Sequence, residues 1–169
     1  QEFADMVIDG FKSVLDSLDY EVLGRLSKDL MKYQRIAAFG LLKAESAAMN
    51  FQHDMLMLGK IVTTKVSFSQ QKEYMKKADE NDCILIFSYG GYYFTNYHKL
   101  CFKEGHKPKI YMITTDPKGH ENKYVDEVIH FNAPPFYQVG NPYLMQLIEG
   151  ILVQNLAYEL RKEESLNSN

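Results

Sequence analysis

The sequence predicts an α/β protein: a three-layer α-β-α fold with a five-stranded, mostly parallel sheet and an N-terminal helical extension. Three observations support this fold class. The run Cys83–Phe87 is apolar at every position, which is typical of a strand buried on both faces of a parallel sheet. Other short apolar runs alternate with stretches of helical periodicity. Several of these runs end at glycine or serine, as strand-to-helix loops in such folds often do.

The first 33 residues are expected to form a helical arm that docks on a domain comprising residues 34–169. A chain of 169 residues fits one domain with an extension. Apolar spacing predicts a helix over residues 3–17 and a second at Tyr20–Tyr33, with Asp19 as its N-cap. Neither helix is long or apolar enough to be stable alone, so both must pack on the remaining chain.

The first half of the domain alternates strand and helix candidates. In chain order they are a strand at Arg35–Phe39, a helix over 44–58 that stops at Gly59, a strand at Ile61–Thr63 and a polar helix over Gln70–Lys77 capped by Ser69. The glycine stop and the serine cap are common signals of helix ends and starts.

The second half begins with the central strand. It is followed by a helix over Thr95–Glu104, strands at Lys109–Thr114 and Glu127–Phe131, an irregular connector over 132–140 and a last helix. Asn141-Pro142 predicts the start of that helix, because proline is favoured at the first helical position. The helix should reach about Arg161 and leave a frayed polar tail. Its apolar residues occupy more than one face, so we expect both the sheet and a second chain to cover it.

The loop after the central strand is a candidate anion site. Ser88 ends the strand, and Gly90 and Gly91 let the backbone turn sharply. A helix start after such a loop offers unpaired N–H groups and a positive dipole end. The loops at Gly40 and Thr114 leave the same edge of the sheet, and Lys43 offers a charge near it. The alternative is a tight turn that binds nothing.

Composition excludes several classes of function. The net charge of −3 gives no nucleic-acid signature, and no apolar run reaches the length of a membrane span. Cys83 and Cys101 read as small buried hydrophobes in a reducing compartment, so a cytoplasmic protein is expected. The histidines lack metal-ligand spacing. Ser88 lacks the Gly-x-Ser-x-Gly pattern of a hydrolase nucleophile.

From about Asp19 to Arg161, the chain resembles the SIS (sugar isomerase) domain, a flavodoxin-like fold, in the version carried by RpiR-type bacterial transcription regulators. The resemblance rests on the order and spacing of several short pieces. These are Tyr33-Gln34-Arg35-Ile36, Phe39-Gly40, Asp82-Cys83-Ile84-Leu85-Ile86-Phe87-Ser88, Ile113-Thr114 and Val125-Asp126-Glu127-Val128-Ile129.

The resemblance implies a non-enzymatic sensor that binds a sugar phosphate or another small carbohydrate-like effector, with no cofactor and no metal. It implies a homodimer or a tetramer, and DNA binding only through an upstream helix-turn-helix domain that this chain lacks. Residues 1–18 would fit the connector to such a domain. The expected ligand-binding residues are Gly40, Lys43, Ser46, Ser88, Tyr89, Gly90, Gly91, Thr114 and Thr115.

The phosphate-binding loops depart from the family pattern. The first usually reads Gly-x-Gly-x-Ser, but here Leu42 replaces the second glycine and Ala44 the serine. The second usually reads Ser-x-Ser-Gly-x-Thr, but Gly90 replaces its second serine and Tyr93 its threonine. Each hydrogen bond lost to a charged ligand weakens binding by about 1.5–3 kcal/mol.

Two other functions stay open. One is a phosphosugar isomerase or a related SIS enzyme, with Glu45 or Glu149 as the acid/base residue. The other is a purely structural dimerisation module. The aromatic cluster at Tyr89, Tyr92, Tyr93, Phe94 and Tyr97 is interpreted as a dimer interface, where tyrosine is enriched, with sugar stacking as the alternative.

Overall fold

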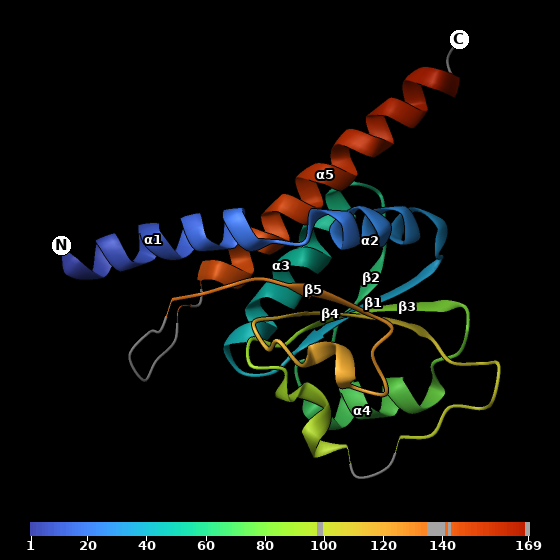
Figure 1. The fold of residues 1–169 in the computed structure, drawn as a ribbon. Helices are drawn as coiled ribbons and strands as arrows, with labels where there is room; N and C mark the ends of the chain where they lie inside the picture. The colour runs from blue at the N-terminus through green and yellow to red at the C-terminus, as the bar shows by residue number, and fades with distance from the viewer. Residues whose placement is uncertain (98–99, 135–140, 142, 168–169) are drawn as a thin grey trace.

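Figure 1 shows the fold in a computed structural model, which describes residues 1–97, 100–134, 141 and 143–167. Five strands form one sheet in the order β2-β1-β3-β4-β5, and all neighbours pair in parallel. The strands are β1 (Arg35–Gly40), β2 (Val62–Thr63), β3 (Asp82–Phe87), β4 (Lys109–Thr114) and β5 (Glu127–His130). The predicted fold class is confirmed.

Helices cover both faces of this sheet. They are α1 (Glu2–Ser17), α2 (Tyr20–Lys32), α3 (Lys43–Met57), α4 (Phe68–Lys77) and α5 (Tyr143–Asn167), with short 3₁₀ turns η1 (Tyr92–Asn96) and η2 (Gly119–Glu121). Helices α2, α3 and α5 lie on one face, and α4 with η1 lies on the other (Figure 1). The two N-terminal helices fall where their apolar spacing predicts them.

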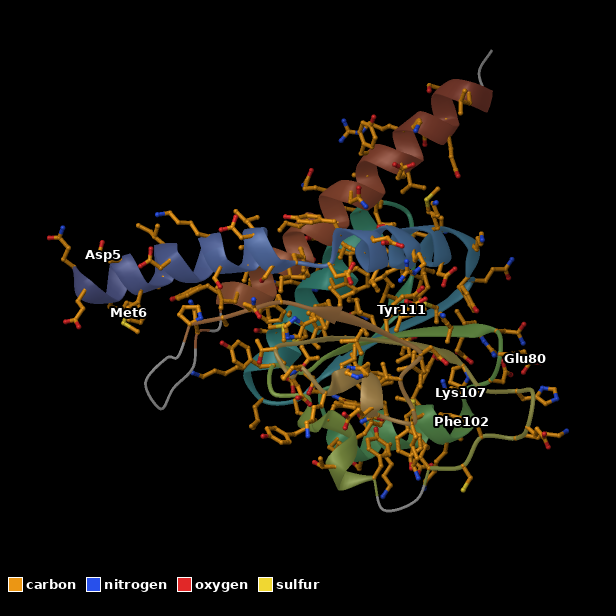
Figure 2. The ribbon with its side chains drawn as sticks, in the orientation of Figure 1. Asp5, Met6, Glu80, Phe102, Lys107 and Tyr111 are labelled. Carbon is orange, nitrogen blue, oxygen red and sulfur yellow. The ribbon has the colours of Figure 1, made fainter. Side chains whose placement is uncertain are left out.

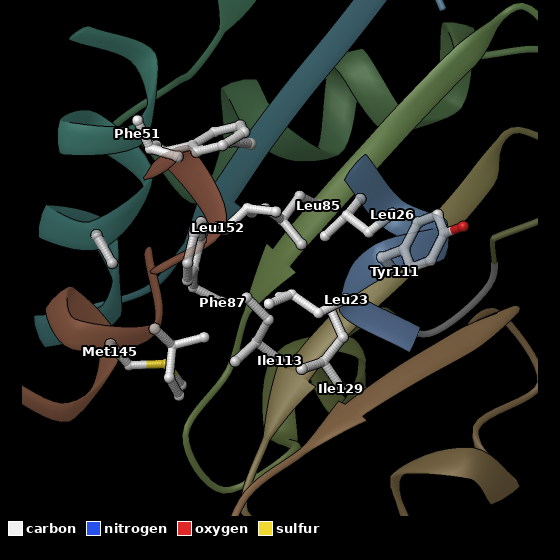
Figure 3. Close-up of a cluster of buried hydrophobic side chains, with 14 of the residues drawn as sticks. Leu23, Leu26, Phe51, Leu85, Phe87, Tyr111, Ile113, Ile129, Met145 and Leu152 are labelled. Atoms are coloured by element: carbon white, nitrogen blue, oxygen red, sulfur yellow. The ribbon is translucent and has the colours of Figure 1, made fainter. Parts of the chain in front are cut away.

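The period-two alternation of the strands divides their side chains between two cores. Leu85 and Phe87 of β3 face the core beneath α2, α3 and α5. Figure 3 shows them beside Leu152 of α5 and Phe51 of α3. Ile84 faces the opposite core, beneath α4. Every strand side chain is thereby committed to one face, so a shift of register by one residue would exchange the two cores.

The expected helix over Thr95–Glu104 is wrong. Among the described residues of this stretch, only Tyr92–Asn96 is helical, as one short 3₁₀ turn, and residues 100–108 contain no helix. Bulky rings cover the sheet face instead, because an aromatic side chain buries a large area from a single residue. Tyr93, Phe94 and Tyr97 are almost fully buried, with ring centroids 5.0–5.7 Å apart.

These three rings therefore belong to the protein's own core, and the interpretation of the cluster as a dimer interface is wrong for them. The residues on either side differ: Tyr92 is exposed, and Tyr89 is half-buried against Phe131. Tyr93, Phe94 and Tyr97 thus pack as part of the core at a place where the sequence predicted a helix.

Helix boundaries confirm two predicted signals and correct two others. Asp19 caps α2 by accepting a hydrogen bond from the Val22 N–H at 3.0 Å, and Gly59 ends α3 with φ of 77°. Helix α4 begins at Phe68, so Ser67 takes the N-cap position expected for Ser69. Helix α5 continues to Asn167, well past Arg161, into the tail expected to fray. Pro142 and the connector residues 135–140 lie outside the described residues.

A charged cluster fastens β1 to β3 at the amino edge of the sheet. The buried Asp82 carboxylate accepts hydrogen bonds at 2.8 Å from the Arg35 guanidinium, the Tyr74 hydroxyl and the Asp79 N–H. Arg35 also pairs with the Asp79 side chain, and this hydrogen bond, with one from Asn81, lowers the pKa of Asp79 to about 2. The Asp79 carboxylate therefore stays ionised throughout the neutral range.

We expect Asp82→Ala to lower the free energy of unfolding by about 3 kcal/mol, because it leaves the partly buried Tyr74 hydroxyl and the Asp79 N–H without their acceptor and removes one of the two carboxylates that pair with Arg35. Urea denaturation at pH 7 measures this change. The matched control is Glu73→Ala, which removes an exposed pair with Lys76 and should change stability by less than about 0.5 kcal/mol. Equal stabilities of the two variants would contradict the role of Asp82.

Candidate functional site

Three strand ends meet at the carboxyl edge of the sheet. Gly40 of β1 pairs with Phe87 of β3, and Phe87 pairs with Ile113 of β4. From β1 the chain crosses to β2 on one side and later to β3 on the other. The strand order therefore reverses between β1 and β3, which is where open α/β sheets bind ligands. The Gly40 and Ser88 loops lie next to each other, as expected for neighbouring strands.

The Gly40 loop is held in a shape that its own sequence disfavours. A side chain at Gly40 would place Cβ 2.5 Å from the Ala44 carbonyl oxygen, so only glycine fits. Leu42 has φ of 56° and ψ of −124°, the conformation of the first central residue of a type II′ turn, which glycine dominates. The Leu42 side chain is 91% exposed, so burial of its apolar surface does not offset the strain of this backbone conformation. A glycine-type turn therefore occurs at the position where the SIS pattern has its second glycine.

The side chains at the start of α3 divide between the loop and a neighbouring helix. Lys43 is the first residue of α3 and its side chain is exposed. The Ser46 hydroxyl donates to the Lys43 carbonyl oxygen at 2.8 Å and accepts from Gln146 of α5 at 3.0 Å. Ser46 therefore joins α3 to α5, whereas Lys43 remains at the sheet edge.

The Ser88 loop is closed by Ser88 itself. The Ser88 Oγ accepts a hydrogen bond from the Tyr93 N–H at 3.1 Å, and the Ser88 carbonyl oxygen accepts from the Gly91 N–H at 3.1 Å. Gly91 has φ of 75°, which favours glycine. Because η1 is so short, the expected anion-binding helix start after this loop is replaced by a tight turn. The Ser88 hydroxyl proton is still able to donate to a ligand.

The two threonines that follow β4 tie this loop to the next strand. The Tyr89 carbonyl oxygen accepts hydrogen bonds from the Thr114 hydroxyl at 3.1 Å, the Thr115 hydroxyl at 2.8 Å and the Thr115 N–H at 2.9 Å. Thr114 is fully buried, and Thr115 is half-buried. Their first role is to fix the Ser88 loop against β4.

An acidic side chain approaches the glycine pair. The Asp116 Oδ2 lies 2.7 Å from the point where a Cβ on Gly91 would stand. The Asp116 Oδ1 accepts from the Lys118 N–H at 3.0 Å. A carboxylate this close opposes a bound phosphate but is a good acceptor for sugar hydroxyl groups. The sequence reasoning did not identify Asp116, because no motif marks it.

A buried polar network beneath the edge was also missed. Gln71 of α4 donates to the Gly40 carbonyl oxygen at 2.9 Å and to the Lys65 carbonyl oxygen at 2.6 Å. Its Oε1 accepts from the Tyr93 hydroxyl at 2.9 Å, which in turn accepts from the Tyr97 hydroxyl at 3.1 Å. The one available signal was spacing: Gln71 lies four residues before the buried Met75, on the inner face of α4.

Two buried polar atoms near this edge lack hydrogen-bond partners among the described residues. They are the Thr64 Oγ1, just after β2, and the Asn141 Nδ2, just before α5. Gln146 bonds Ser46, so the start of α5 lies beside the start of α3 at the same edge. Unsatisfied buried donors are costly, and a ligand with acceptor oxygens would satisfy them.

The two carboxylates considered for acid/base chemistry lie in different places. Glu45 is half-buried in the first turn of α3. Glu149 is buried between α5 and α3, where burial and the nearby Asp54 carboxylate raise its pKa to about 8. Asp54 is near the far end of α3, so Glu149 lies away from the Gly40 and Ser88 loops.

Within the part of the chain that the structure describes, no cluster of three or more histidine, cysteine, aspartate or glutamate side chains is arranged to hold a metal ion. No described helix combines the length and apolar character needed to cross a membrane.

We expect Leu42→Gly to stabilise the protein by about 1 kcal/mol, because relief of the backbone strain exceeds the entropy that glycine adds to the unfolded chain. Chemical denaturation measures the change. Leu56→Gly is the matched control: Leu56 is also exposed but lies inside α3, so it should destabilise by about 1 kcal/mol. Destabilisation by both substitutions would refute the strain at Leu42.

We expect Glu149→Gln to raise the melting temperature, more at pH 8 than at pH 5. With a usual value of 4.5 in the unfolded chain and about 8 in the fold, the unfolded state ionises first, so stability falls as pH rises between these values. Glutamine removes that loss. Thermal unfolding at pH 5, 6.5 and 8 measures it, with the exposed Glu163→Gln as control. A gain independent of pH would disagree with a raised pKa.

Comparison with known proteins was made by sequence and by structure. No family model and no curated protein matches the sequence. Among solved structures, the NanR protein of Vibrio vulnificus, complexed with ManNAc-6P, superposes with a TM-score of 0.76 at 14% identity over 95% of this chain. This chain spans 61% of the NanR chain.

Two further structures match over most of both chains. The sugar isomerase domain of the RpiR transcription factor from Sphaerobacter thermophilus gives a TM-score of 0.72 at 12% identity, over 99% of this chain and 96% of that one. A putative sugar-phosphate isomerase from Listeria monocytogenes gives 0.73 at 16% identity, over 95% and 88%. The chain therefore has the fold of sugar isomerase domains, including that of an RpiR transcription factor.

Proposed function

We propose that this chain is the effector-binding domain of an RpiR-type transcription regulator, without catalytic activity. The effector is a sugar phosphate or a similar small carbohydrate, bound where the β1, β3 and β4 loops meet. Its proposed contacts are the backbone of the Gly40 loop and of Ser88–Gly91, with the Lys43, Ser88 and Thr115 side chains. Ser46, Tyr89 and Thr114 hold the surrounding segments in place, since their polar atoms already join neighbouring elements.

The observation that carries the proposal is the glycine-type turn at Leu42, at the point where the strand order reverses. A leucine keeps that strained geometry only if the surroundings impose it, and such strain gathers at ligand sites. The structural comparisons support the choice of ligand and regulator. One similar structure is complexed with ManNAc-6P, and the sugar isomerase domain of an RpiR transcription factor matches over nearly its whole length.

The proposal extends to assembly. Residues 1–33 act as an arm and residues 34–169 as the binding domain, which works in the cytoplasm as a homodimer or a tetramer. DNA contact comes from a helix-turn-helix domain outside this chain. The effector changes the assembly only by its difference in affinity for two arrangements of the dimer.

Ligand binding is tested by isothermal titration and thermal shift with N-acetylmannosamine 6-phosphate, arabinose 5-phosphate, their unphosphorylated sugars and inorganic phosphate. We expect a phosphosugar to raise the melting temperature, since ligands that bind the folded state stabilise it. Ser88→Ala should weaken binding about tenfold or more through the lost hydrogen bond. Ser69→Ala on α4 is the control. If no compound binds, the reading as a purely structural module is favoured.

The Asp116→Asn variant identifies the ligand class by the sign of its effect. If a phosphate lies beside Gly91, removing the carboxylate charge should tighten binding by roughly fivefold to tenfold. If the Asp116 carboxylate accepts from neutral sugar hydroxyl groups, binding should weaken instead. An unchanged affinity would place the ligand away from Gly91 and contradict the proposed site.

Turnover separates the sensor from an enzyme. The purified chain is incubated with aldose and ketose phosphates, and interconversion is followed by chromatography or NMR. Binding without interconversion supports the sensor. Interconversion that Glu45→Gln abolishes, at unchanged affinity, would identify an isomerase with Glu45 as its acid/base residue.

A further inference from the structure

The buried side chain of Gln71 joins three loops at the carboxyl edge of the sheet. It comes from the first turn of α4 and is fully buried. Its Nε2 donates to the Gly40 carbonyl oxygen, which ends β1, and to the Lys65 carbonyl oxygen, which follows β2. Its Oε1 accepts from the hydroxyl of Tyr93, whose own N–H donates to the Ser88 Oγ. One amide therefore connects the chain segments that leave β1, β2 and β3.

The chemistry of its members fixes the direction of every hydrogen bond in this network. Carbonyl oxygens only accept, so the two that Gln71 contacts must face its NH₂ group, and both amide protons are used. The Oε1 can then only accept, so the Tyr93 hydroxyl donates to it and accepts in turn from Tyr97 at 3.1 Å. Neither a flipped amide nor a carboxylate at this position makes the same set of bonds. The network therefore specifies a glutamine in one orientation.

Strand pairing holds these loops on one side of β1 more firmly than on the other. β1 and β3 are paired up to Gly40 and Phe87. β1 and β2 pair over only two residues, and their last pair is Ala37 with Thr63. β1 continues past that pair to Gly40, where Gln71 bridges it to the segment after β2. The amide thus takes the place of a strand ladder at the point where these loops leave the sheet.

The network lies in the core beneath α4, on the sheet face away from α2, α3 and α5. Met75, Tyr93 and Tyr97 belong to this core, and Figure 2 shows Phe102 beside α4 on the same face. A hydrogen bond shielded from water by such a core is stronger than one in water, and a group left unpaired there is costly. The network therefore holds the loops in place before any ligand arrives.

We propose that Gln71 is a positioning residue of the effector site. By holding the Gly40 carbonyl it imposes the glycine-type turn at Leu42, and through Tyr93 it aligns the Ser88 loop with that turn. Gln71 itself does not touch the ligand, because it is fully buried and both its amide protons are used. A site formed in advance binds more tightly, since no loop has to be ordered on binding. The inference rests on the proposed function for the identity of the ligand.

The first test needs no ligand. The effect of Leu42→Gly on urea denaturation is measured in the wild-type chain, in Gln71→Met and in Met75→Ala. Methionine keeps the length of glutamine but has no donor for the loop carbonyl oxygens, and Met75 is an equally buried residue one turn further along α4. We expect Leu42→Gly to raise the denaturation midpoint in wild type and in Met75→Ala. In Gln71→Met this effect should be lost, because release of Gly40 relieves the strain at Leu42.

The same effect of Leu42→Gly in all three backgrounds, whatever its sign, would overturn the inference. If Gln71→Met does not fold, Tyr93→Phe takes its place. This substitution removes one hydroxyl from the network and keeps the Tyr93 N–H bond to Ser88. We expect it to reduce the Leu42→Gly effect in part, and an undiminished effect would again overturn the inference.

The second test measures affinity for N-acetylmannosamine 6-phosphate by isothermal titration, at a temperature where all variants are folded. We expect Gln71→Met to weaken binding about tenfold or more, because the loops must be ordered by the ligand itself. Met75→Ala loses stability without releasing the loops, so it should bind like wild type. Equal affinities of the two variants would overturn the inference. A wild-type chain that binds no phosphosugar overturns the sensor instead, and the coupling to Leu42 then decides whether Gln71 shapes the loop.

Discussion

The pairing of β1 with β3 is the constraint on which the rest of the structure depends. Six residues of each strand are in register, from Arg35 with Asp82 to Gly40 with Phe87. At the amino end, the Arg35 guanidinium of β1 donates a hydrogen bond to the buried Asp82 carboxylate of β3. At the carboxyl end the same register brings the Gly40 and Ser88 loops side by side. The position of the candidate site is therefore decided at the opposite edge of the sheet, where no ligand is expected.

The site uses most of its hydroxyl groups for its own architecture. Ser88 closes its loop, and Thr114 and Thr115 hold the Tyr89 carbonyl oxygen. What the proposed site offers a ligand is mainly backbone N–H groups and the donor capacity of the Ser88 hydroxyl. Such a site recognises shape and charge more than individual hydroxyl groups, and Asp116 adds an acceptor beside Gly91. This agrees with the proposed role in sensing, where a modest differential affinity between two arrangements is sufficient.

The strands and most helices follow from the sequence because their signals are local. Apolar runs predicted the strands, and the Asp19 cap and the Gly59 stop marked two helix boundaries. The stretch after Gly91 could not be predicted in this way, because its apolar spacing is compatible with a helix. Only tertiary packing determines that Tyr93, Phe94 and Tyr97 are buried around a short 3₁₀ turn instead. Gln71 was overlooked because its one signal, a spacing of four residues from Met75, is weak on a polar helix, and its partners come from other segments of the chain. Strand order correctly predicted that the Gly40 and Ser88 loops lie side by side, while the hydrogen-bond partners of their side chains depended on contacts between separate loops.

Leu42 has a consequence for how this loop tolerates substitution. The turn around it is imposed by the close contact of Gly40 with α3 and by the anchoring of the Gly40 carbonyl to α4, so its shape does not rely on the residue at its tip. A residue other than glycine can therefore occupy position 42 while the backbone keeps the glycine-type turn. A glycine motif in the sequence and a loop shape in the fold are then separable, and this chain matches solved structures although no family model matches its sequence. In such a loop the anchoring contacts on either side define the path, and the residue at the tip is specified only weakly.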